Sequence, residues 1–306
     1  ENATYPSNYS YKYPKAGEKN SVVSVHVYDI KDRVTTPMNI GEETDIYIPR
    51  IKWTQDPKRL AIMKLNRFQN RLEILLANAR VGSTTVLYRE ENKYYIAEEN
   101  LDNLVFTEDG KYFIMSSEKN GYSHLYLYTM GGKEVQPITS GNYDVADFYG
   151  YDPVKKLYYY SSHEESPLEK YVYSIDLKGK KKKLTPTKGW NEAEFSKSFK
   201  YFVNTVSNAD MPPLYTLYNA TGKAVRTLED NAALKEMLGK YAVAKREYIQ
   251  IPAADGKTML NAWIMKPVNF DATKAYPLLI TQYSGPNSQQ VQNSWSMDWA
   301  QYLAQE

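Results

Sequence analysis

The sequence predicts a mainly β protein, most of which is an incomplete β-propeller. A polar turn followed by an apolar, alternating strand occurs at four places, and the strands begin at Leu60, Tyr112, Leu157 and Tyr201. The successive starts are 52, 45 and 44 residues apart. A regular period of about 40–50 residues, built from short strands, is typical of propeller blades.

Each repeat continues in the same way after its apolar strand. A second alternating strand follows at Leu72–Leu76, Leu125–Tyr128, Tyr171–Ile175 and Leu214–Tyr218, and a shorter, more polar one at Thr85–Tyr88, Val135–Thr139, Lys183–Thr185 and Ala224–Leu228. Strands at Ser21–Tyr28 and Val34–Ile40 indicate half of an earlier unit. We therefore expect about four and a half four-stranded blades. Another antiparallel β domain built from hairpins remains the alternative, and an open propeller would leave edge strands that favour association.

The pattern changes after the last repeat. A short helix is predicted from Asp230, as the N-cap, to Leu238, because Gly239 lies just past its end. Three strands are then predicted over Tyr248–Pro252, Met259–Pro267 and Pro277–Tyr283, with a hairpin turn at Asp255–Lys257 and a final helix over Trp295–Leu303.

Composition excludes several classes of function. The 38 Lys and Arg nearly balance the 36 Asp and Glu, which argues against a nucleic-acid-binding surface. The dense charge run Lys178–Lys183 lies between two strands of one repeat and is predicted to be an exposed turn. The sequence contains no run of 18 apolar residues, so it predicts no transmembrane helix. The chain has no cysteine, so disulfides, thiolate metal sites and a cysteine nucleophile are excluded.

Tyr283 is the candidate catalytic residue. It ends the apolar run that begins at Pro277, just before a Gly-Pro break, so it lies where a strand would become a loop. Ligands bind outside the carboxyl ends of strands in α/β sheets, and a phenol placed there can donate a hydrogen bond to a developing oxyanion. From position alone, a tyrosine that simply packs at a strand end remains the alternative.

Five segments in the same order resemble dipeptidyl peptidase IV, within the prolyl oligopeptidase superfamily of serine peptidases. They are Tyr13–Gly17, Leu65–Asn70, Leu228–Leu234, the strand and Tyr-Xaa-Gly-Pro motif at Tyr276–Pro286, and Trp299–Ala304. The resemblance extends from about Tyr13 to Leu303. It implies a full propeller of about eight blades followed by an α/β-hydrolase domain, of which this chain would hold only parts.

The resemblance therefore implies a chain truncated at both ends, an expectation that the absence of an initiating Met also favours. Residues 1–229 would be the C-terminal part of the propeller, and residues 230–247 a linker with a short helix. Residues 248–306 would be the start of the catalytic domain: its first strands and first helix, truncated before the nucleophile.

The implied activity is that of a serine-type dipeptidyl aminopeptidase, which releases N-terminal Xaa-Pro or Xaa-Ala dipeptides from peptides. In this family the tyrosine at the position of Tyr283 supplies half of the oxyanion hole, and Asn287 and Gln289 would line the leaving-group side. No cofactor and no metal are implied. A homodimer, formed partly through the arm at Tyr13–Gly17, is implied, as is a periplasmic, secreted or surface location; the composition is compatible with a bacterial source.

The catalytic triad itself is not expected within this chain. The nucleophile of an α/β-hydrolase needs the turn Gly-Xaa-Ser-Xaa-Gly, which does not occur, and the acid and base follow that serine in the fold's order. His26, His124 and His163 lie early, in or near predicted propeller strands, and are interpreted as structural. A metal site at His163 with its neighbouring glutamates is less favoured than a solvated loop. We therefore expect the isolated chain to be inactive.

The family also holds the substrate's amino group with paired glutamates, because carboxylates bind an ammonium well. In the family that pair precedes the segment matching Tyr13–Gly17, so we do not assign it to Glu164 and Glu165. The family's substrate-binding arginine has no counterpart near Glu99 and Asn100. A related prolyl tripeptidyl peptidase, a non-catalytic propeller used for binding, and a structural or adhesion module remain alternatives.

Overall fold

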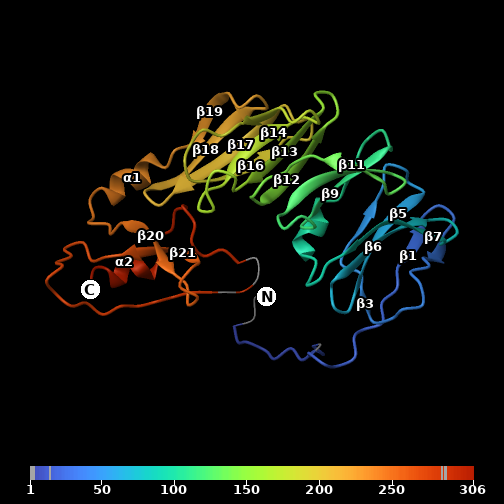
Figure 1. The fold of residues 1–306 in the computed structure, drawn as a ribbon, viewed down its shortest axis with the longest axis horizontal. Helices are drawn as coiled ribbons and strands as arrows, with labels where there is room; N and C mark the ends of the chain where they lie inside the picture. The colour runs from blue at the N-terminus through green and yellow to red at the C-terminus, as the bar shows by residue number, and fades with distance from the viewer. Residues whose placement is uncertain (1–3, 14, 284, 286–287) are drawn as a thin grey trace. The chain divides into compact units, whose positions relative to one another are not determined.

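The computed structural model describes residues 4–13, 15–283, 285 and 288–306. The chain divides into two compact units: residues 1–115 with 128–135, and residues 116–127 with 136–306. Figure 1 traces the strands in chain order. Among the described residues, no helix is both long enough and apolar enough to cross a membrane.

The first strands form one small and one large antiparallel sheet. The small sheet pairs β1 (His26–Asp29) with β2 (Val34–Pro37). The large sheet has the order β3-β5-β6-β7, with β4 also paired to β5. Its strands are β3 (Ile46–Tyr47), β4 (Ile51–Trp53), β5 (Arg59–Asn66), β6 (Arg71–Asn78) and β7 (Thr84–Glu91).

Three four-stranded sheets follow, each made of strands that are consecutive in the chain. After the 3₁₀ helix η1 (Glu98–Asn103), the first of them holds β8 (Val105–Phe106), β9 (Tyr112–Ser117), β10 (His124–Thr129) and β11 (Glu134–Pro137). The second holds β12 (Val145–Asp152), β13 (Leu157–Ser162), β14 (Tyr171–Ile175) and β15 (Lys181–Lys183). The third holds β16 (Trp190–Phe195), β17 (Tyr201–Asn208), β18 (Met211–Asn219) and β19 (Ala224–Glu229).

These sheets confirm the predicted mainly β fold, with four blades and a half-blade before them. The four predicted apolar strands are β5, β9, β13 and β17, and the two strands that follow each of them in the prediction are also present. The first half-unit is shorter than predicted, since β1 begins only at His26 and β2 ends at Pro37. The first strand of each blade, such as β12 or β16, was not located from the sequence.

Aromatic side chains fill the space between the β12–β15 and β16–β19 sheets. Phe202, which is 1% exposed, stacks on Phe195 and Tyr218 with ring centroids 4.8 and 5.2 Å apart. Tyr159, with no exposed surface, stacks on Phe199 at 5.4 Å. Strand β13 is buried along nearly its whole length, as expected for a strand covered on both faces. The two sheets are also joined by a parallel bridge between Lys170, just before β14, and Trp190, at the start of β16.

The chain after the blades contains α1 (Ala232–Leu238), the antiparallel pair β20 (Arg246–Pro252) and β21 (Met259–Met265), and α2 (Trp299–Leu303). The predicted hairpin turn is present, because Gly256 has a φ of +65° and Ala253 donates to the Thr258 carbonyl at 2.8 Å. The final helix is shorter than predicted: Asp298 accepts a hydrogen bond from the Ala300 amide at 2.9 Å and so caps a helix that begins at Trp299.

Two other predictions for this part were wrong. The N-cap of α1 is Asn231, not Asp230, because the helix begins only at Ala232. Asn231 adopts the left-handed conformation and makes no side-chain capping bond, whereas the Asp230 carboxylate accepts from the Ala232 amide at 2.9 Å. The segment Pro277–Tyr283 is not a buried strand. It pairs with no other strand among the described residues, and Leu278, which is 73% exposed, is typical of the run. A strand needs neighbours that satisfy its backbone and cover its side chains.

Candidate functional site

Tyr283 lies in the irregular segment between β21 and α2, and its side chain is 65% exposed. The phenol is therefore accessible to a ligand. Its ring lies close to Gly285, because a Cβ built on that glycine would be 2.7–2.9 Å from ring carbons and the hydroxyl oxygen. A glycine two residues after the tyrosine thus leaves room for the ring to lie against the backbone.

Gln289 attaches the same segment to a blade. Its Nε2 donates to the carbonyl of Pro167, in the connection between β13 and β14, and to the Val291 carbonyl at 2.9 Å. Asn287, the other predicted residue of the leaving-group side, lies outside the described residues. The roles of Tyr283, Asn287 and Gln289 stay predictions.

Asn293 bonds to the blades through both its backbone and its side chain, and sequence reasoning missed it. Its amide N–H donates to the Leu168 carbonyl at 2.8 Å. Its side-chain Oδ1 accepts from the Ala209 amide at 3.1 Å, and its Nδ2 donates to Glu169 Oε1 at 3.4 Å. One asparagine therefore bonds to the β13–β14 connection and to the turn between β17 and β18.

Further bonds fix the chain on both sides of Asn293. The Trp295 amide donates to the Ser207 hydroxyl at 3.1 Å. The Tyr248 hydroxyl, from β20, donates to the Gln292 carbonyl at 2.7 Å. The stretch 289–295 is therefore held between the blade connections and the β20–β21 hairpin.

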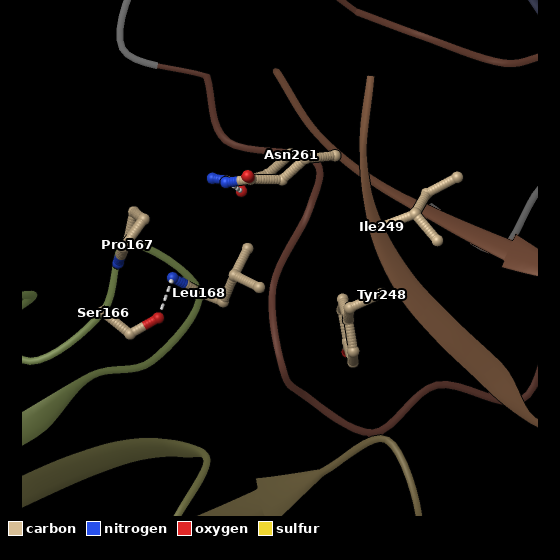
Figure 2. Close-up of a pocket in the computed structure, with 7 residues that line it drawn as sticks. Ser166, Pro167, Leu168, Tyr248, Ile249 and Asn261 are labelled. Carbon is tan, nitrogen blue, oxygen red and sulfur yellow. Dashed lines mark hydrogen bonds between the residues drawn. The ribbon is translucent and has the colours of Figure 1, made fainter. Parts of the chain in front are cut away.

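An open groove of about 350 Å³ lies beside this stretch. In Figure 2, the loop residues Ser166 and Leu168 lie on one side of it and the β20 residues Tyr248 and Ile249 on the other, with Asn261 above them. Pro167 and Gln250 complete the lining. The groove is mostly apolar with amide groups at one end, a composition that suits a peptide-like or small uncharged group.

A buried lysine lies near the same connection. Lys170 is 6% exposed, and its Nζ lies 3.1 Å from Asp147 Oδ2 and 3.4 Å from Glu192 Oε1, above the Trp190 ring. Burial opposes ionisation of Asp147, but the Lys170 charge and hydrogen bonds from Ser161 and Lys170 hold its pKa below the usual value. The lysine is thus paired within the blades and has a structural explanation.

The histidines singled out in the sequence have partners inside their own blades. His163 Nδ1 lies 2.8 Å from the Glu169 carbonyl oxygen, and burial lowers the pKa of its ring, which favours the neutral form. His124 is 3% exposed, with Nε2 2.9 Å from the Gly141 carbonyl oxygen. His26 lies 3.0 Å from the Ser24 hydroxyl. Within the described part of the chain, no group of three or more His, Cys, Asp or Glu residues is arranged to bind a metal ion.

Glu164 and Glu165 are matched by the lysine run. Lys181 Nζ contacts Glu164, and Lys183 Nζ lies 2.8 Å from Glu165 Oε2. Lys181 and Lys183 belong to β15, so only the first part of the predicted turn is a turn. Each glutamate therefore already has an ammonium partner within its own blade.

Comparisons with known proteins relate the whole chain to one group. Residues 1–213 match the family described as the dipeptidyl peptidase IV (DPP IV) N-terminal region. A probable dipeptidyl peptidase 4 of Emericella nidulans is 27% identical over 98% of this chain and 41% of its own length. The dipeptidyl peptidase 4 of Trichophyton rubrum is 29% identical over 98% of this chain and 40% of its own length.

Two crystal structures are similar to this chain. The dipeptidyl peptidase 4 of Porphyromonas gingivalis matches with a TM-score of 0.93 and 44% identity, over 99% of this chain and 43% of that one. A putative dipeptidyl aminopeptidase IV of Bacteroides ovatus matches with a TM-score of 0.85 and 27% identity, over 96% of this chain and 45% of that one. The chain spans about 40% of the length of the curated relatives that it matches. Because the family match covers more than half of its residues, the chain belongs to the family of the dipeptidyl peptidase IV N-terminal region.

Proposed function

We propose that this chain is part of a serine-type dipeptidyl peptidase that releases N-terminal Xaa-Pro and Xaa-Ala dipeptides from peptides. The observation that carries the proposal is the likeness to the P. gingivalis dipeptidyl peptidase 4, at 44% identity over 99% of this chain. That likeness includes the segment with Tyr283 as well as the blades. The relatives are dipeptidyl peptidases by name, which supports peptide substrates.

In this proposal, Tyr283 donates its hydroxyl hydrogen to the oxyanion that forms when a serine attacks the scissile carbonyl. Such a donor acts on charge that develops in the transition state, so it lowers the barrier rather than tightening substrate binding. The phenol of Tyr283 is exposed, so a substrate can reach it. Asn287 and Gln289 would line the side from which the shortened peptide leaves.

The remaining catalytic groups would come from outside these 306 residues, since the sequence contains no Gly-Xaa-Ser-Xaa-Gly turn. The isolated chain would then be inactive. The proposal includes a homodimer that uses the arm at Tyr13–Gly17, in which Tyr13 is 76% exposed.

The test is hydrolysis of Gly-Pro-p-nitroanilide by the full-length protein that contains this chain, compared with its Tyr283→Phe variant. Loss of one oxyanion donor should lower kcat by about 100- to 1,000-fold and leave KM nearly unchanged. The matched control is Tyr276→Phe. The Tyr276 hydroxyl accepts a hydrogen bond from the Asp271 amide at 3.0 Å, so its loss should affect only the local turn.

Equal kcat values for wild type and Tyr283→Phe would contradict the role of the phenol. Absence of any hydrolysis by the full-length protein would contradict the dipeptidyl peptidase assignment. Hydrolysis by the 306-residue chain alone would show that the nucleophile had been placed wrongly.

A further inference from the structure

We propose that Asn293 is a positioning residue for the reaction, which clasps the segment carrying Tyr283 to two blade connections. This inference rests on the proposed function, since it concerns the placement of the proposed oxyanion donor. Asn293 does not touch the reacting atoms in this account. It acts by fixing where the chain after Tyr283 leaves the blades.

The clasp uses the backbone N–H, the side-chain Nδ2 and the side-chain Oδ1 of one asparagine to reach two different segments. The backbone N–H and the side-chain Nδ2 donate to Leu168 and Glu169, which lie just before β14. The side-chain Oδ1 accepts from Ala209, in the turn after β17. Because an amide both donates and accepts, it can hold the two connections at once.

The acceptor Glu169 is itself fixed, so the clasp has a rigid base. Glu169 is 8% exposed, and its Oε2 accepts a hydrogen bond from the Tyr171 hydroxyl at 2.7 Å. Lys188 Nζ lies 3.4 Å from its Oε1. Burial, followed by the hydrogen bond with Glu169 and its charge, raises the pKa of Tyr171, which keeps the phenol a donor.

Chain length shows why more than one attachment is needed near Tyr283. An extended chain spans at most about 3.5 Å per residue, so ten residues from Tyr283 to Asn293 would allow roughly 35 Å. The Gln289 bond to Pro167 lies only six residues from Tyr283, which limits that span to roughly 20 Å. Asn293 holds the chain beyond Gln289 against the same β13–β14 connection. The chain is therefore fixed at two points, which limits how the stretch that carries Tyr283 can rotate about the Gln289 bond.

The first test needs no activity and uses the 306-residue chain. In Asn293→Ala, the Ala209 amide loses its acceptor, so its hydrogen exchange should become about tenfold faster, as expected for loss of about one hydrogen bond. The Leu217 amide, in the middle of β18, should exchange as in the wild type. Asn208→Ala is the matched control: it alters the same turn, where Asn208 Nδ2 donates to the Lys188 carbonyl at 3.2 Å and its Oδ1 accepts from the Asp210 amide at 3.0 Å, so it removes bonds of the turn that do not involve Asn293.

The second test is a double-mutant cycle in the full-length protein with Gly-Pro-p-nitroanilide. Asn293→Ala should lower kcat about tenfold and change KM less than about twofold. In the Tyr283→Phe background the same change should lower kcat less than about twofold, because the donor that it positions is already gone. Asn208→Ala should leave both parameters close to wild type.

Asn293→Asp gives a variant of the same shape in case the alanine variant folds poorly. It keeps an acceptor for the Ala209 amide, loses the donor to Glu169 and places two carboxylates together, so its kcat should also fall. A tenfold loss of kcat from Asn293→Ala in both backgrounds would overturn the positioning role, as would an unchanged kcat. If the wild-type protein cleaves nothing, the proposed function fails and the positioning role fails with it, whereas unchanged Ala209 exchange in Asn293→Ala would refute the clasp alone.

Discussion

Asn191 links the last two blades, and its replacement should be among the most costly single changes in the chain. It has no exposed surface. Its Nδ2 donates to the carbonyls of Lys170 at 2.9 Å and Thr187 at 3.0 Å, and its Oδ1 accepts from Asn204 Nδ2 at 3.0 Å. Asn191→Ala removes these three bonds, together with a longer one to the Gly189 carbonyl at 3.4 Å, and leaves the Asn204 amide buried with no acceptor from Asn191.

The expected cost follows from those contacts. Each of the three bonds contributes about 1 kcal/mol, and a buried polar group left unpaired costs about 1–3 kcal/mol. The free energy of unfolding should therefore fall by about 4–6 kcal/mol, measured by urea denaturation of the 306-residue chain. Asn142→Ala, at an exposed position before β12, should change it by less than about 0.5 kcal/mol. A loss below about 1 kcal/mol for Asn191→Ala would refute the argument.

Two further predictions concern turns. Hydrogen bonds from the Thr258 hydroxyl and amide lower the pKa of Asp255 to about 2. Because this folded-state pKa lies below the ordinary value of 3.8, the ionised carboxylate stabilises the hairpin above about pH 4, and that contribution is lost as the pH falls through about 2. An NMR titration checks this, and a measured pKa near 3.8 would contradict it. Gly189→Ala should lower the thermal midpoint far more than Gly179→Ala: both glycines have positive φ, but a Cβ at Gly189 would lie 2.1 Å from the Ser207 carbonyl oxygen, and one at Gly179 would meet no atom within 4 Å. Equal shifts in the two variants would show that the close approach at Gly189 is relieved without cost.

The blade repeat was predictable because its central strands are apolar and regularly spaced. The first strand of each blade was not, since its buried positions lack a hydrophobic pattern. In β16, the buried residues are Asn191 and Ala193, which alternate with the exposed Glu192 and Glu194. A buried asparagine satisfied by backbone groups of another strand looks, in the sequence, like a loop residue.

The segment Pro277–Tyr283 shows the opposite error. Its local composition favours a strand, but strand formation depends on neighbours that composition does not reveal. In the described residues, β20 and β21 pair only with each other, so no sheet extends to this segment. Local apolarity was therefore a poor guide to burial here.

For the candidate site, a family resemblance singled out Tyr283 and Gln289, whereas Asn293 gave no signal. Its partners Ala209 and Glu169 are 84 and 124 residues away in the chain. Such contacts arise only when the blades bring their connections together. A single sequence carries no local pattern for them.

The most direct test of the central claim is to incubate the full-length protein that contains this chain with a peptide that has Pro at its second position, and to weigh the products. The account predicts release of the N-terminal dipeptide and a peptide shortened by two residues. The Tyr283→Phe variant should release the dipeptide at least about 100-fold more slowly than the wild type. Release of a tripeptide would indicate a tripeptidyl peptidase. An unchanged peptide would contradict the assignment of this chain to a peptidase.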